Sequence, residues 1–349
     1  MPLPADQAPL TADQENELAR LLQGGVPFEP EPFRVLGASL GLSSARVLAQ
    51  LRTWRAEDKL REISAVLEGS LLGYDSALVA GRIPPEDLDR VGAVISAHPT
   101  VTHNYVRDHE KNLWFTIAVP REQDLDRTLE FLAREAEVSE PFQSLRRTKT
   151  FKIGVNFDLK TKTSRTKLEA KREMRAIEVS EGEKALFRAL QTPLPYVERP
   201  FALLAEAVGS TEEELLAFAR KHLGNALRRY VGTFRHRKLG VSGNGMGVWR
   251  VPLAREAEVG LQLAAAPEVT HCYARNAIEG FPFSVYSMIH GPDREAVLAT
   301  AARLAEETGV APEDYVVLFS TRELKKTRLR YFLPELDAWW EERCGGVLA

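Results

Sequence analysis

The sequence predicts an α+β protein built as a tandem repeat. The heptapeptide Val-Thr-His-X-Tyr-X-Arg occurs twice, at residues 101–107 and 269–275, and the two copies lie 168 residues apart. The same offset aligns further positions, namely Pro32 with Pro200, Gly41 with Gly209, Arg61 with Arg229 and Pro99 with Pro267. A match that keeps one register over such a span indicates a duplicated unit, so the 349 residues form two similar halves.

Each half opens with a helical module. The spacing of apolar residues predicts first-half helices over 11–23, 32–40 and 44–57, followed by a strand over 60–66. In the second half it predicts helices over 185–190, 201–208 and 211–223. Three short helices and a wing-like strand are typical of a helix-turn-helix module.

The remainder of each half alternates strands and helices in the order βαββαβ. The first half is expected to have strands over 74–80, 101–107, 113–119 and 151–157 with helices over 86–97 and 123–136. The second is expected to have strands over 246–251, 269–275, 283–289 and 315–319 with helices over 255–265 and 294–307. This order predicts a ferredoxin-like domain, an antiparallel sheet with helices on one face.

The predicted boundaries follow from these patterns. Residues 1–66 form the first helix-turn-helix module, 67–160 the first ferredoxin-like domain, 161–178 a basic linker, 179–238 the second helix-turn-helix module and 239–349 the second ferredoxin-like domain. Successive strand side chains alternate between the two faces of a sheet. The His, Tyr and Arg of each heptapeptide, spaced two residues apart, should therefore project from the same face.

Composition and charge restrict the possible partners. The formal net charge is −3 and the chain has two cysteines, Cys272 and Cys344, too few for a disulfide framework or a four-cysteine metal site. No apolar run reaches the roughly 18 residues of a membrane span, and the acidic N-terminal region lacks the pattern of a signal peptide. These features predict a cytoplasmic protein that binds neither a membrane nor, from its overall charge, nucleic acid.

A helix-turn-helix module joined to a ferredoxin-like domain resembles the Lrp/AsnC regulators, but the detailed motifs resemble another family. They are Asn-Leu-Trp-Phe-Thr (112–116), Gly-Asn-Gly-Met-Gly-Val-Trp (243–249), His-Cys-Tyr-Ala-Arg (271–275), Phe-Pro-Phe-Ser-Val-Tyr-Ser-Met-Ile-His-Gly (281–291) and Leu-Phe-Ser-Thr-Arg-Glu-Leu-Lys-Lys-Thr (318–327). These look like the siroheme decarboxylases, with the first half similar to the D-type subunit and the second to the L-type subunit. The resemblance covers nearly all of both halves.

The resemblance implies that CO₂ is removed from the C12 and C18 acetate side chains of siroheme to give 12,18-didecarboxysiroheme, in the biosynthesis of haem d1 or in an alternative haem pathway. It implies no cofactor and no metal of the protein's own, because the substrate carries the iron. The fused halves would form a pseudo-heterodimer within one chain. Further homo-oligomerisation stays open.

The chemistry of a tetrapyrrole with many carboxylates suggests the site residues. Arginine binds planar carboxylates bidentately, so the candidate substrate-binding cations are Arg61, Arg107, Arg229 and Arg275. His103 and His271 are the catalytic candidates, either as proton donors to the carbon that loses CO₂ or as ligands of the siroheme iron. Flat apolar surface for the macrocycle is expected from Tyr105, Tyr273 and Trp114.

The alternative is a transcription regulator of Lrp/AsnC type or a tetrapyrrole-sensing DNA-binding protein. DNA binding needs a basic recognition helix, yet the third helix of the second half opens with Glu212, Glu213 and Glu214. The motif histidines could also be structural. Of the remaining histidines, His98, His109, His222 and His236 are expected at the surface, and His290 is a weak candidate for the site.

Overall fold

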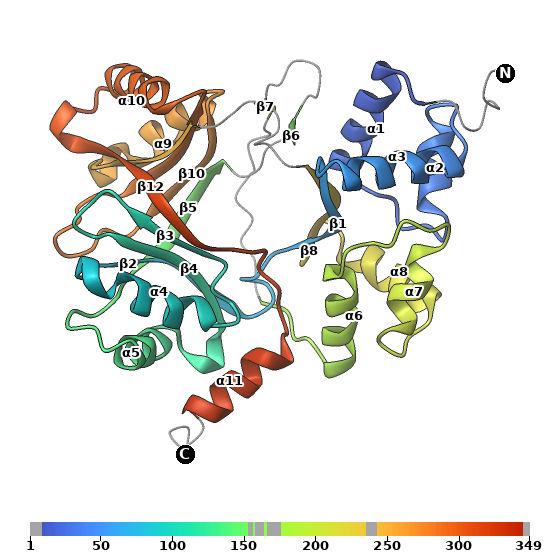
Figure 1. Cartoon of the computed structure of the whole chain (residues 1–349), viewed down its shortest axis with the longest axis horizontal. Coiled ribbons are helices and arrows are strands. Elements are labelled where there is room, and N and C mark those ends of the chain that lie inside the picture. The colour runs from blue at the N-terminus through green and yellow to red at the C-terminus, as the bar shows by residue number, and fades with distance from the viewer. Residues whose placement is uncertain (1–8, 153–155, 158–163, 166–175, 235–242, 345–349) are drawn as a thin grey trace. The chain divides into compact units, whose positions relative to one another are not determined.

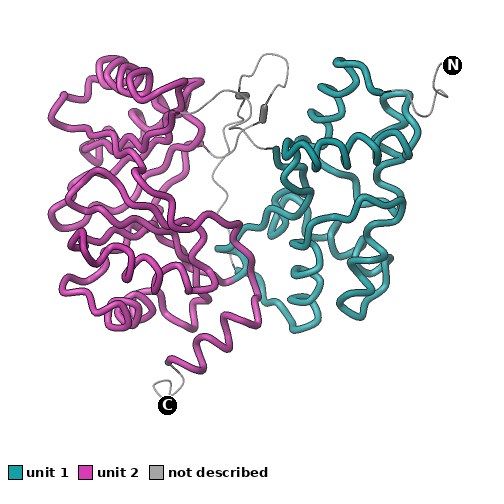
Figure 2. The backbone as a smooth tube through the Cα atoms, in the orientation of Figure 1, with its two compact units in different colours: residues 1–72, 156–165, 176–240 teal, residues 73–155, 166–175, 241–349 magenta. Residues whose placement is uncertain are grey.

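The computed structural model describes residues 9–152, 156–157, 164–165, 176–234 and 243–344. The chain divides into two compact units, drawn in teal and magenta in Figure 2. Unit 1 comprises Met1–Leu72, Asn156–Arg165 and Ala176–Gly240, and unit 2 comprises Gly73–Val155, Thr166–Arg175 and Val241–Ala349. Each unit therefore collects the like modules of both halves instead of containing one half. Within the described residues, no helix is long and apolar enough to span a membrane.

Unit 1 contains the two helical modules, and their local sequence signals repeat. The first comprises α1 (Ala12–Gly24), α2 (Pro32–Ala38), α3 (Ser44–Ala56) and β1 (Leu60–Leu67), and the second comprises α6 (Glu181–Gln191), α7 (Pro200–Glu206), α8 (Glu212–His222) and β8 (Leu227–Phe234). Thr11 and Ser180 each cap their helix through a reciprocal capping box. Both second helices begin with proline, whose fixed φ suits the first turn. Antiparallel pairing of β1 with β8 joins the two modules.

Unit 2 contains the two βαββαβ domains (Figure 1). The first consists of β2 (Tyr74–Gly81), α4 (Leu88–Ala97), β3 (His103–Arg107), β4 (Leu113–Pro120), α5 (Leu125–Glu135) and β5 (Gln143–Lys152). The second consists of β9 (Gly243–Trp249), α9 (Glu256–Ala265), β10 (Val269–Arg275), β11 (Val285–Gly291), α10 (Arg294–Thr308) and β12 (Tyr315–Lys326). Their strands form one closed barrel in the order β10-β11-β9-β12-β3-β4-β2-β5. The predicted fold class is confirmed.

The final strand of each half closes the barrel by pairing with the motif strand of the other half. β5 pairs with β2 of its own half and then with β10, whereas β12 pairs with β9 and then with β3. The bounds of the strand predicted over 151–157 were wrong: β5 starts at Gln143 and ends at Lys152, so the strand includes the basic stretch before Phe151. The strand predicted over 315–319 likewise continues to Lys326. The basic linker predicted over 161–178 lies largely outside the described residues.

Two glycines allow this closure. Phe151 of β5 packs on Gly260 of α9, and Leu324 of β12 packs on Gly92 of α4. Any Cβ at either glycine would collide with the facing side chain. The two glycines occupy equivalent positions of the repeat, 168 residues apart, so both halves accept the partner's last strand in the same way.

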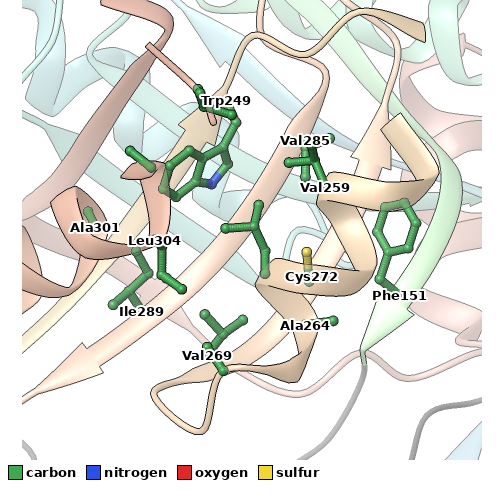
Figure 3. Packing of buried hydrophobic residues seen from close by; sticks show 14 of the residues in the cluster. Phe151, Trp249, Val259, Ala264, Val269, Cys272, Val285, Ile289, Ala301 and Leu304 are labelled. Carbon is green, nitrogen blue, oxygen red and sulfur yellow. The ribbon is translucent and has the colours of Figure 1, made fainter. Parts of the chain in front are cut away.

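The barrel strands separate three apolar cores. One lies beneath α4 and α5 and includes Phe115. A second lies beneath α9 and α10; Figure 3 shows Phe151, Trp249 and Cys272 among its members. The third includes Trp114 and Leu145 of the first half with Met246, Val248, Tyr286 and Leu318 of the second. Because these residues come from strands all around the barrel and alternate with those of the outer cores, they fill its interior.

Some features were not expected. A further helix, α11 (Pro334–Cys344), places Trp339 and Trp340 in the first outer core. His98 and His222 were predicted at the surface and are buried instead. The His98 ring lies 4.3 Å from the Trp339 ring, centroid to centroid. Burial lowers the pKa of His98 to about 3, so this histidine is neutral and structural. His236 lies outside the described residues.

Candidate active site

The motif side chains of each strand share one face of the sheet, as their spacing predicted, and that face is the interior of the barrel. In β3, the Asn104 amide donates to the carbonyl of Gly92 and to Ser96 Oγ on α4, which places Asn104 on the outer face. In β10, Cys272 packs in the outer core and its thiol contacts the carbonyl of Gly260. The alternating residues therefore point inward: His103, Tyr105 and Arg107 from β3, and His271, Tyr273 and Arg275 from β10.

Both histidines lie at the same end of the barrel. All neighbouring strands are antiparallel, and β3 and β10 are four places apart in the closed order, so the two strands run in the same direction on opposite walls. His103 is the first residue of β3 and His271 is near the start of β10. The pseudo-twofold axis that relates the halves therefore follows the barrel axis.

A threonine hydroxyl holds each histidine by the same ring nitrogen. Thr102 Oγ1 lies 3.0 Å from Nδ1 of His103, and Thr270 Oγ1 lies 3.0 Å from Nδ1 of His271. The second partner of the threonine hydroxyl differs between the two halves. Thr102 Oγ1 is 2.8 Å from Thr116 Oγ1, whereas Thr270 Oγ1 is 2.8 Å from Nε2 of His290. With Nδ1 occupied in both rings, Nε2 is the nitrogen suited to meet a ligand.

The motif arginines each bridge the two halves. Arg107 donates from Nη1 to the carbonyl of Leu318 at 2.9 Å, and Arg275 donates from Nη1 to the carbonyl of Leu145 at 2.8 Å. Each guanidinium also lies near the motif tyrosine, with its Cζ 5.7 Å from the centroid of the Tyr105 ring and 5.4 Å from that of Tyr273. Burial lowers the pKa of both arginines to about 10, which leaves them cationic at neutral pH.

The partner strands give the two walls different charges. Beside β3, the register of β12 sets Glu323 opposite Tyr105 and Lys326 opposite His103. Beside β10, the register of β5 sets Thr150 opposite Tyr273 and Arg147 opposite Arg275.

Arg147 adds a second cation to the wall that carries His271. Its Cζ lies 6.0 Å from the centroid of the Tyr273 ring, and its charge contributes to the lowered pKa of Arg275. The repeat is therefore symmetric in its motif but not in the residues that surround it.

The remaining predicted residues are Trp114, Arg61 and Arg229. Trp114 faces the interior, but it is fully buried, and its Nε1 donates to the carbonyl of Lys111 at 2.5 Å. Arg61 and Arg229 belong to unit 1, near opposite ends of the β1–β8 pair, where Arg229 aligns with Val66. The structure thus brings together the His, Tyr and Arg of each motif strand but does not bring Arg61 next to Arg229.

Sequence reasoning missed the threonines and the residues from the final strands. Thr102 and Thr270 precede the histidine in both copies of the heptapeptide, so the repeat itself held the signal. Arg147, Glu323 and Lys326 had no such signal, because their place depends on pairing between the halves. Among the described residues, no group of three or more His, Cys, Asp or Glu side chains could hold a metal ion.

Comparisons with known proteins agree on one family. Residues 15–61 and 183–225 match the siroheme decarboxylase NirDL-like HTH domain, and residues 71–152 and 238–325 match the AsnC-like ligand binding domain. A siroheme decarboxylase of Hydrogenobacter thermophilus is 34% identical over 330 residues, which cover 94% of this chain and 97% of that protein. A siroheme decarboxylase alpha subunit of Desulfovibrio desulfuricans is 35% identical over 41% of this chain and 82% of its own length.

Solved structures lead to the same result. The crystal structure of the siroheme decarboxylase NirDL matches with a TM-score of 0.78 and 30% identity, covering 95% of this chain and 99% of that one. A second structure, with NirDL in co-complex with an iron-uroporphyrin III analogue, matches equally well. The subunit match spans less than half of this chain, in keeping with a fusion of two related subunits. Over nearly its whole length, then, this chain is a member of the siroheme decarboxylase family of enzymes.

Proposed function

We propose that this enzyme decarboxylates the C12 and C18 acetate side chains of siroheme to give 12,18-didecarboxysiroheme, in the formation of haem d1 or in an alternative haem pathway. The observation that carries the proposal is the pair of inward-facing Thr-His-Tyr-Arg walls in a chain related over 94% of its length to a siroheme decarboxylase. The related NirDL in co-complex with an iron-uroporphyrin III analogue supports a tetrapyrrole as the ligand. The enzyme would act in the cytoplasm.

The residues at the barrel end suit each requirement of this reaction. Loss of CO₂ from an acetate leaves an electron pair on the methylene carbon, which the conjugated macrocycle stabilises and which must then take up one proton to become a methyl group. His103 and His271 would deliver that proton from Nε2, because Nδ1 contacts a threonine hydroxyl in each ring. Ligation of the siroheme iron through the same Nε2 is the alternative role.

The remaining carboxylates of siroheme need cations. Arg107 and Arg275 stay charged despite burial, and Tyr105 and Tyr273 lie between each arginine and its histidine. Arg61 and Arg229 of unit 1 remain candidate substrate-binding cations. Since siroheme brings both the iron and the electron sink, the protein would need no cofactor of its own.

The first prediction follows from this division of roles. The purified chain, kept anaerobic with siroheme and without nicotinamide, flavin or added metal, should release two molecules of CO₂ per substrate. Mass spectrometry of the tetrapyrrole should show two losses of 44 Da, the mass of CO₂. Each carboxylic acid group, counted in its protonated form, is replaced by one hydrogen atom on carbon. A strict requirement for an added organic cofactor would contradict the mechanism.

The second prediction addresses the regulator alternative. Binding to duplex DNA should be no tighter than the roughly 10⁻⁴ to 10⁻⁶ M of non-specific contacts, measured by fluorescence anisotropy at physiological salt. Glu213 and Glu214 are exposed at the start of α8 and would repel phosphate, whereas Glu212 is buried in an ion pair with Arg199. Nanomolar, sequence-selective binding would instead support a DNA-binding regulator.

A further inference from the structure

One hydroxyl joins two imidazole rings in the second half. Thr270 Oγ1 lies 3.0 Å from Nδ1 of His271 and 2.8 Å from Nε2 of His290. His290 belongs to β11, whose Val285 and Ile289 pack in the outer core, so His290 points inward on the same side as Tyr286. Burial, followed by the positive charge of Lys326, lowers the pKa of His290 below its usual value. His290 is therefore neutral at neutral pH.

The first half has no imidazole at the equivalent place. The register pairs Tyr105 with Trp114 in the first half and Tyr273 with Tyr286 in the second. Four residues beyond Trp114 stands Ala118, and four residues beyond Tyr286 stands His290. In the first half the Thr102 hydroxyl instead meets the Thr116 hydroxyl, which can rotate to donate or accept.

A hydroxyl between two imidazoles couples their tautomers, because it donates only one hydrogen bond. If Thr270 donates to Nε2 of His290, then Nδ1 of His271 must carry a proton and donate to Thr270. If Thr270 donates to Nδ1 of His271, then Nε2 of His290 must carry a proton. In either case, the protonation of Nε2 in His271, the nitrogen that would meet the substrate, depends on His290.

We propose that His290 is a positioning residue that acts through the Thr270 hydroxyl to fix one tautomer of His271. The second half therefore fixes its histidine through a second imidazole, whereas the first half has Ala118 at the equivalent position. The inference rests on the proposed role of His271 in siroheme decarboxylation, and it adds a specific difference between the two halves: His103 has the same threonine contact but no second ring to fix its tautomer. Second-shell partners of this kind orient functional histidines in other proteins.

Substitutions on either side of the hydroxyl test the coupling. His290→Leu and Thr270→Val should each lower kcat for siroheme about tenfold with KM changed by less than about threefold, because the chemical step and not binding loses its geometry. His290→Gln and Thr270→Ser, which keep a hydrogen-bonding group, should stay within about threefold of the wild-type kcat. The double variant His290→Leu/Thr270→Val should be no slower than Thr270→Val alone.

Thr116→Val serves as the matched variant of the first half, since it removes a threonine contact that involves no second imidazole. Because the two histidines would serve separate decarboxylations, the rate constant of each step in the double variant Thr116→Val/His290→Leu should equal that of the corresponding single variant. A wild-type kcat in His290→Leu, or a double variant His290→Leu/Thr270→Val whose losses multiply, would overturn the inference.

A measurement without substrate separates this inference from the proposed function. Long-range ¹H–¹⁵N spectra of histidine-labelled protein should show a single tautomer for His271 in the wild type and in Thr270→Ser, and a mixture of tautomers in His290→Leu. An unchanged His271 pattern in His290→Leu would refute the coupling even if the enzyme is active. A wild-type protein that shows the expected pattern but does not decarboxylate siroheme would contradict the proposed function and leave the coupling established.

Discussion

His271→Ala and His103→Ala are each expected to reduce the rate of siroheme decarboxylation by about 10² or more, as the loss of a general acid does. Each CO₂ lost must be replaced by a proton on carbon, and these two inward-facing side chains at the barrel end are imidazoles, the side chain that most often serves as a general acid. Neither ring belongs to the apolar cores, so the fold should persist. The measurement is single-turnover product analysis under anaerobic conditions, with circular dichroism and thermal unfolding of each variant as the folding control.

The two halves serve as controls for each other. If both variants decarboxylate at the wild-type rate, the motif histidines are structural and the catalytic assignment is wrong. If one variant alone is impaired, the other half is a scaffold and the impaired half contains the working pocket. Accumulation of a singly decarboxylated product in one variant would assign the second acetate to that half.

The same pair of variants distinguishes proton donation from iron ligation. A histidine bound to the siroheme iron through Nε2 changes the visible spectrum of the complex, whereas a proton donor near the acetate does not. A variant that loses turnover but keeps the wild-type spectrum therefore identifies a proton donor. A variant that loses both identifies an axial ligand.

Most of the fold could be predicted because the same sequence pattern of helices and strands occurs in both halves. The helices, their caps and the βαββαβ order depend on residues close together in sequence, so local signals were sufficient. The exact 168-residue offset of His103 and His271 also showed that both motif strands expose equivalent side chains. That the His, Tyr and Arg of each motif share one face followed from strand alternation alone.

The parts that could not be predicted depend on pairing between the halves. The start of β5 was missed because basic residues such as Lys149 are depleted in strands, and only the pairing of β5 with β10 makes this stretch a strand. His98 looked like a surface residue because α11, which packs against it, lies far away in the sequence. The bridging role of the motif arginines was hidden for the same reason, since their carbonyl partners belong to the opposite half.

Arg107→Ala and Arg275→Ala are expected to weaken siroheme binding by roughly 1.5 to 3 kcal/mol for each lost charge-assisted contact. The structure adds a second expected effect. Each substitution removes the donor to a buried carbonyl, that of Leu318 or Leu145, and an unpaired buried carbonyl costs about 1 to 3 kcal/mol of stability. The affinity is measured by titration with siroheme in visible absorption, and the free energy of unfolding by urea denaturation.

Arg294→Ala provides the matched control. Arg294 is a half-exposed arginine of the same unit that pairs with Asp108 at 2.8 Å, so its loss should cost no more than about 1 kcal/mol of stability and should leave siroheme affinity unchanged. If Arg107→Ala and Arg275→Ala lower the stability of the barrel but bind siroheme as tightly as the wild type, the two arginines serve to join the halves and their assignment to the substrate is wrong. If the loss in free energy of siroheme binding exceeds the loss in free energy of unfolding, each guanidinium both joins the two halves and binds a carboxylate of the macrocycle. A planar guanidinium with five N–H donors can bind both partners at once.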